Sequence, residues 1–235
     1  LKALTGHNIS ALTTAQTQAL TTAQLQALTT TQIGNLTDED LSELTPTQFG
    51  RFSTAQIKAF TATSLSNLAT SQFQALAATQ IGALTTEQLA EISETTFGIL
   101  TSTQAKGLTT TQIASLDAFK FSELSTTAIA NLSAAQIGSL TSTQLDNLVP
   151  EVFAAFTSTQ VKGLTTTQVA LLRDTQVQGL TATALTGLSA SQIKALATAA
   201  VNGLDTTQMQ ALAGTQIAAL TTTQIVALDT ADVAN

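Results

Sequence analysis

The chain offers few residues that could carry catalysis. His7 is the only histidine, and there is no cysteine in the 235 residues. Serine and threonine are abundant, but a nucleophilic hydroxyl needs a neighbouring base, and the residues around His7 supply only hydroxyls and amides. We therefore expect a protein that is not an enzyme, with no catalytic residues.

Metal and cofactor sites are equally hard to place. The densest acidic cluster is Asp38, Glu39, Asp40 and Glu43, in the run D-E-D-L-S-E. This run lacks the alternating Asp/Asn, the glycine and the distal Glu of a calcium loop, and its acids are typical of the first turn of a helix. One histidine and no cysteine exclude a multi-His or thiolate zinc site. The glycines occur singly and form no phosphate-binding loop. We expect neither a metal site nor a cofactor.

Net charge and the length of the apolar runs argue against two classes of partner. Eight Lys and Arg stand against 15 Asp and Glu, a formal net charge of −7. A nucleic-acid-binding protein needs a basic surface to meet phosphate, so no nucleic-acid partner is expected. No apolar run approaches the ~18 residues of a membrane span, so no membrane insertion is expected either.

An eight-residue repeat organises the whole sequence. Counted in eights from Leu4 to Leu228, all 29 positions hold Leu, Ile or Phe. Five residues after each lies a second series, which is large and apolar at 27 of 29 positions and fails only at Thr17 and Ala105. We number the slots of this octad one to eight from the first series. Slots one and six are expected to be buried.

The period excludes two common structures. Eight residues turn a continuous helix by about 80° beyond two full turns, so an apolar stripe would rotate too fast for a coiled-coil partner. In one flat strand, slots one and six would point to opposite faces because both gaps between them are odd. A β-solenoid with turns between the slots stays open as the alternative.

Several features favour one short helix in each octad. Slot two holds Thr, Ser or Asp at 23 of 29 positions, which are residues that cap helix N-termini. Slot five holds Gln at 19 of 29, and the spacing T-x-x-Q predicts a capping box. The two prolines, Pro46 and Pro150, both occupy slot three, which is then the first helical position. Slot eight is mostly small, and a small residue there either lets the backbone turn or lets a neighbouring unit approach closely.

These features together predict an all-α solenoid, a superhelical rod of short helices. Helices of this length do not hold alone in water, where roughly 12–15 residues are needed, so each must pack on its neighbours. The octad phase is unbroken, which predicts one continuous domain over residues 1–235. Pro46 and Pro150 are 104 residues apart, or thirteen octads, so duplication of a larger block is a further hypothesis. Both termini fall in mid-octad without a polar end unit, and we expect either continuation in a longer array or end-to-end self-association.

Two surfaces could bind a partner. The irregular octad Leu116–Glu123 contains Phe119 outside the apolar slots and Lys120 in place of Gln, and Pro150 and Arg173 lie in other irregular octads. A protein-binding solenoid face there is one alternative function. The threonines of slots two to four could form an ice-binding or surface-binding face, although Ser, Ala, Asp and Glu substitute freely at slots three and four.

The unit L-T-T-x-Q-[IVL] occurs in Leu20–Leu28, Leu28–Leu36, Leu108–Leu116 and Leu220–Leu228. It resembles octapeptide repeat tracts of long bacterial surface or secreted proteins, which are often adhesin-like, acidic and free of cysteine. The resemblance covers the whole chain, carries over no site residue, and implies an extracellular or cell-surface structural role as a stalk, spacer or filament.

Overall fold

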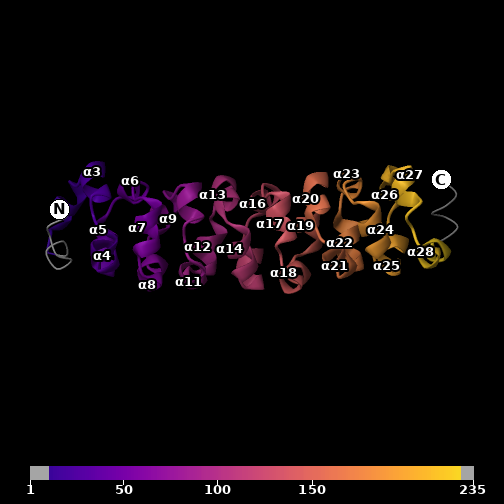
Figure 1. The fold of residues 1–235 in the computed structure, drawn as a ribbon, viewed down its shortest axis with the longest axis horizontal. Helices are drawn as coiled ribbons and strands as arrows, with labels where there is room; N and C mark the ends of the chain where they lie inside the picture. Colours follow the sequence, from indigo (N-terminus) through magenta and orange to yellow (C-terminus); the bar gives the residue numbers. More distant parts are fainter. Residues whose placement is uncertain (1–10, 229–235) are drawn as a thin grey trace. The chain divides into compact units, whose positions relative to one another are not determined.

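The computed structural model describes residues 11–228, and within them every regular element is a short helix. The 27 helices, α2 to α28, are four to six residues long, and no strand occurs in this part of the chain. The predicted all-α fold with one helix per octad is therefore confirmed, and the β-solenoid is not what the chain forms. The chain divides into two units, Leu1–Leu116 and Asp117–Asn235, which are described separately. Figure 1 shows the order of the helices along the sequence.

The helices follow the octad without interruption in both units. The first unit contains α2 (Thr14–Gln18), α3 (Thr22–Gln26), α4 (Thr30–Gly34), α5 (Asp38–Glu43), α6 (Pro46–Phe49), α7 (Thr54–Ala59), α8 (Ala62–Ser66), α9 (Thr70–Gln74), α10 (Ala78–Ile81), α11 (Thr86–Glu91), α12 (Glu94–Gly98), α13 (Ser102–Gly107) and α14 (Thr110–Ser115). The second unit contains α15 (Ala118–Ser122), α16 (Thr126–Ala130), α17 (Ala134–Gly138), α18 (Ser142–Asn147), α19 (Pro150–Phe153), α20 (Ser158–Gly163), α21 (Thr166–Ala170), α22 (Asp174–Gly179), α23 (Ala182–Leu185), α24 (Ala190–Ala195), α25 (Thr198–Asn202), α26 (Thr206–Ala211), α27 (Gly214–Ile217) and α28 (Thr222–Ala227).

The start of each helix is set by the predicted capping residues. In α14, the Gln112 backbone N–H donates to Thr109 Oγ1 over 3.1 Å, and the Thr109 backbone N–H donates to Gln112 Oε1 over 2.7 Å. This reciprocal pair satisfies two helix-start donors that have no partner within the helix. Pro46 and Pro150 occupy the first position of α6 and α19, as predicted. Where slot two is Ala69, only the second bond remains, from the Ala69 N–H to Gln72 Oε1.

Extended residues at slots one and two lead from α13 into α14. Leu108 has φ −61° and ψ 133°, and Thr109 has φ −78° and ψ 159°, so the chain changes direction at slots one and two. No residue of the described chain has a positive φ. The helices therefore end without the left-handed glycine cap that closes many helices.

The apolar slots form the core of each unit. Ile57, Leu89 and Ile113 at slot six are completely buried, and the slot-one residues of the interior octads are nearly so. Phenylalanines enlarge the core in places, and Phe49 packs on Phe60 with ring centroids 5.7 Å apart. The burial of two large apolar side chains per octad supplies the tertiary packing that such short helices require.

One superhelical turn takes between three and four octads. Helices three apart in the chain pack together, as α10 does with α13 and α17 with α20. In Figure 1, α4, α8 and α11 of the first unit lie along one edge of the ribbon, so the helices on that edge recur after four and then three octads.

Glycine at slot eight allows successive turns to approach closely. A Cβ built on Gly107 would lie 2.1 Å from the Ala78 carbonyl oxygen, and one on Gly163 would lie 2.2 Å from that of Ala134. Real Cβ atoms do not approach backbone oxygen this closely. A small residue at slot eight was expected either to let the backbone turn or to let a neighbouring unit approach closely. Because no described residue has a positive φ, the glycines at slot eight serve the close approach of successive turns.

Candidate interaction surfaces

The residues considered for catalysis or metal binding are His7 and the acidic cluster. His7 lies outside the described residues. The acidic cluster forms the body of α5, where Asp40 Oδ2 accepts the Thr37 backbone N–H over 2.7 Å. Asn67 donates to Asp38, and Thr14 donates to Glu43, from helices on adjacent turns. Within residues 11–228 no group of His, Cys, Asp or Glu is arranged to hold a metal.

The glutamines of slot five form the most regular polar feature of the structure. Gln112 is only 3% exposed, and its Nε2 donates to the carbonyl oxygens of Ile81 (3.0 Å) and Leu84 (2.7 Å). The Ile81 carbonyl belongs to the last residue of α10 and also accepts the Leu84 N–H over 3.2 Å, while Leu84 lies in the segment that joins α10 to α11. The amide thus caps its own helix through Oε1 and the helix on the previous turn through Nε2.

This bridge recurs through both units and was missed by the sequence analysis, which assigned slot five only to the capping box. Fourteen glutamines of slot five donate to the carbonyl oxygen of the residue 28 positions earlier. They are Gln48, Gln56, Gln72, Gln80, Gln88, Gln104, Gln112, Gln160, Gln168, Gln176, Gln192, Gln208, Gln216 and Gln224. The high share of Gln, above what a capping box alone requires, was the signal for it.

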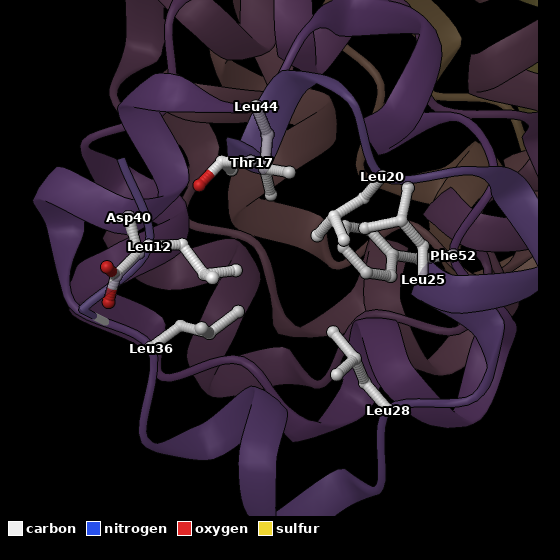
Figure 2. Close-up of a pocket in the computed structure, with 9 residues that line it drawn as sticks. All are labelled: Leu12, Thr17, Leu20, Leu25, Leu28, Leu36, Asp40, Leu44 and Phe52. Carbon is white, nitrogen blue, oxygen red and sulfur yellow. The ribbon is translucent and has the colours of Figure 1, made fainter. Parts of the chain in front are cut away.

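A small apolar pocket lies at the N-terminal end of the first unit, where slot six holds Thr17. Its volume is about 20 Å³, enough for one water molecule. Figure 2 shows the lining side chains, which are Leu12, Thr17, Leu20, Leu25, Leu28, Leu36, Asp40, Leu44 and Phe52. Threonine is shorter than the Leu, Ile or Phe found in the same slot elsewhere, so the pocket reads as incomplete core packing.

The irregular octads of the second unit carry an exposed patch. Val149 and Leu171 are both more than half exposed, and both are large apolar residues. Arg173 lies beside them, with its Nε 3.2 Å from Asp146 Oδ1 and its Nη2 3.3 Å from the Leu148 carbonyl oxygen. We call Asp146, Val149, Leu171 and Arg173 the lateral patch. A shallow groove beside it is lined by Ser142, Thr143, Asp146 and Leu171.

Phe119 lies on a helix adjacent to this patch. It is 69% exposed on α15, which packs against α18. Pro150 follows Val149 as the first residue of α19. Of the three irregular residues named from the sequence, Pro150 and Arg173 are thus brought to one place, and Phe119 lies one turn away. Val149 and Arg173 also replace the hydroxyl or carboxyl residues of slot two, so neither side chain caps its own helix, although the Arg173 N–H still donates to Gln176 Oε1 over 3.0 Å.

The threonines divide into two chemical groups. At slot two the hydroxyl is committed to capping, as Thr29 Oγ1 accepts the Gln32 N–H over 3.2 Å. At slots three and four the side chains are exposed, as at Thr110 and Thr111. Slots three and four, where Ser, Ala, Asp and Glu also occur, therefore hold the exposed threonines whose hydroxyls are not used as helix caps.

Comparison with known families gives one match. The family model described as the ALTTAQ repeat matches residues 1–38. The hexapeptide itself occurs twice there, as Ala11–Gln16 and Ala19–Gln24, and each copy contains the capping threonine and the slot-five glutamine. No curated protein matches the chain. The chain is thus similar to a repeat tract over this segment, and the octad and the helices continue the same pattern beyond it.

No helix among residues 11–228 has the length and apolar character to cross a bilayer.

Proposed function

We propose that this chain is a non-enzymatic structural protein that forms an extended rod, used as a stalk, spacer or self-assembling filament outside the cell. The observation that carries the proposal is the packing of octads: helices pack on helices one turn away, as α10 does on α13, and slot-five glutamines such as Gln112 join successive turns. Such a repeat gains length by adding turns, because every turn buries the face of the one before it.

The surface chemistry supports the same role. The octads place Thr at exposed positions and keep the large apolar residues inside, and the net charge of −7 opposes sideways clumping. The extracellular or cell-surface location rests on the resemblance to repeat tracts of bacterial surface proteins. Labelling of intact cells with an antibody to the chain tests that location, and signal only after lysis would contradict it.

Small-angle X-ray scattering tests the shape. A compact domain of 235 residues has a radius of gyration of about 18 Å. We expect a clearly larger value, with the linear cross-section region that a rod produces. A radius of gyration near that of a globule would overturn the proposal.

A second function, binding of a protein partner, is favoured by the lateral patch. Two exposed apolar side chains and two lost helix caps at one place reduce stability without a structural gain, as residues kept for binding do. Replacing Leu171 and Val149 with Thr tests this in a pull-down from the native host. Loss of a partner that binds the unaltered chain would support binding, and unchanged capture would exclude this patch.

A further inference from the structure

Asn202 and Gly203 form the only Asn-Gly dipeptide of the sequence, and they lie at the end of α25. In such a dipeptide the backbone nitrogen of the glycine can reach the side-chain amide carbon of the asparagine, because glycine has no Cβ to hinder the approach. A slot-one leucine with a buried side chain follows each of the asparagines Asn35, Asn67, Asn131 and Asn147. The residue that follows therefore separates Asn202 from these four.

The side chain of Asn202 is also less restrained than most of the others. Asn202 is exposed, and its amide forms no hydrogen bond with residues 11–228. By contrast, the amide of Asn67 donates to Asp38 over 2.6 Å, and those of Asn131 and Asn147 each donate to a backbone carbonyl oxygen over 2.9 Å. Asn35 has an exposed and unbonded amide as well, so it is the internal reference for the effect of the following residue.

The helix that ends at Asn202 lacks both polar contacts that fix the typical octad. The slot-two residue of α25 is Ala197, which gives no side-chain cap, and its slot-five residue is Ala200, which has no amide to donate to the previous turn. Among the helices of residues 11–228, only α19 also lacks both contacts. The Gly203 N–H donates to the Ala199 carbonyl oxygen over 3.0 Å, and this bond has to open before the nitrogen can react. Such local opening is easiest where few contacts hold a helix end.

We propose that Asn202 is a site of spontaneous covalent modification, at which opening of the end of α25 lets the side-chain amide convert to a carboxylate. The Gly203 nitrogen loses its proton and bonds to Asn202 Cγ, the bond from Cγ to Nδ2 breaks, and ammonia leaves with that proton. Water then opens the cyclic imide. Cleavage between Cγ and the nitrogen gives aspartate, and cleavage between the main-chain carbonyl carbon and the nitrogen gives isoaspartate. Nothing is oxidised or reduced, and water is the only co-reactant.

Both products weaken the helix in which they form. Each places a negative charge at the C-terminal end of α25, which the helix dipole disfavours. Isoaspartate also routes the main chain through Cγ and so lengthens it between Val201 and Leu204, which are both buried. Because α25 packs on α22 and α28, conversion loosens the contact between successive turns at this octad. The converted fraction grows with the age of the chain, whether or not the chain serves as a rod.

Ageing of the purified full chain tests the site. Samples are kept in native buffer and in urea, and conversion at each asparagine is followed by tandem mass spectrometry, with labelling by an isoaspartate methyltransferase as a second readout. In native buffer at mildly alkaline pH we expect Asn202 to convert at least about ten times faster than Asn35. The rate should fall at mildly acidic pH, because the Gly203 nitrogen has to lose its proton. Equal rates at the two asparagines, or conversion of Asn202 only in urea, would overturn the proposal.

Two variants, each checked for helix content by circular dichroism, separate the dipeptide from the helix that carries it. Gly203→Ala keeps the fold, because the added Cβ clashes only with the flexible end of the Gln178 side chain, and it should slow conversion about tenfold. Ala197→Thr with Ala200→Gln leaves the dipeptide intact and supplies the missing cap and amide, so it should also slow conversion. Ala213→Thr adds a cap to α27 instead and is the matched control, with an unchanged rate expected. An undiminished rate in either of the first two variants would overturn the proposal.

Discussion

Changing one buried glutamine to glutamate isolates the bridge between turns. In Gln112→Glu the capping oxygen that accepts the Thr109 N–H is kept, while both donors to the carbonyls of Ile81 and Leu84 are lost. The new carboxylate would lie in a site that is 3% exposed, with those two carbonyl oxygens within 3.0 Å.

The expected cost follows from these contacts. Two hydrogen bonds contribute about 0.5–1.5 kcal/mol each, and a buried charge left without a donor costs more than either. We expect Gln112→Glu to lower the free energy of unfolding by about 3–5 kcal/mol at pH 8.

The loss should depend on pH. Burial against carbonyl oxygens raises the pKa of the new carboxyl above its unfolded value of about 4.3. At pH values between the unfolded pKa and the higher folded pKa, the folded variant binds more protons than the unfolded one. The free energy of unfolding of the variant therefore rises as pH falls through that range.

The assay is urea denaturation followed by circular dichroism at pH 8 and pH 5, with the unaltered chain at each pH as reference. Gln24→Glu is the matched control, since it has the same slot and the same capping contact but no buried carbonyl partner, and it should change stability by less than about 0.5 kcal/mol. Equal stability of the two variants would refute the structural role of the bridge.

Three further outcomes are expected, each read from the urea or thermal unfolding midpoint. Gly107→Ala should destabilise because its Cβ would meet a backbone oxygen at 2.1 Å, whereas Gly214→Ala, with open space around it, should be neutral or stabilising by up to about 1 kcal/mol; equal effects would exclude close approach as the reason for glycine. Thr110→Pro should be tolerated at the first position of α14, while Gln112→Pro should disrupt that helix, and equal tolerance would show that the helix starts elsewhere. Thr17→Val should raise the midpoint slightly by making the pocket wall apolar, and a lower midpoint would show that the hydroxyl is needed there.

Much of the local structure could be predicted from one octad. The spacing of Thr109 and Gln112 predicted the capping box, and Pro150 marked the first helical position, because both depend on residues no more than three apart. Burial of slots one and six followed from their regular apolar character. These features depend only on residues within one octad, so they could be predicted from the local sequence.

The contacts between turns could not be predicted in the same way. The acceptors for the Gln112 amide, Ile81 and Leu84, lie 31 and 28 residues earlier, and nothing in a single octad fixes that distance. It depends on how steeply the chain winds, which is set by small residues such as Gly107 at the contact between turns. The lateral patch was only partly foreseen: Arg173 was named as irregular, but its bonds to Asp146 and Leu148 depend on the same winding.

The amide that spans 28 to 31 residues also constrains how such a gene can change in length. A single inserted codon would move every later Gln, Leu and Thr out of register with the preceding turn, whereas insertion or loss of eight codons restores every contact with an equivalent residue. Recombination between repeats would therefore yield viable proteins only in steps of eight residues, and natural length variants should differ by multiples of eight.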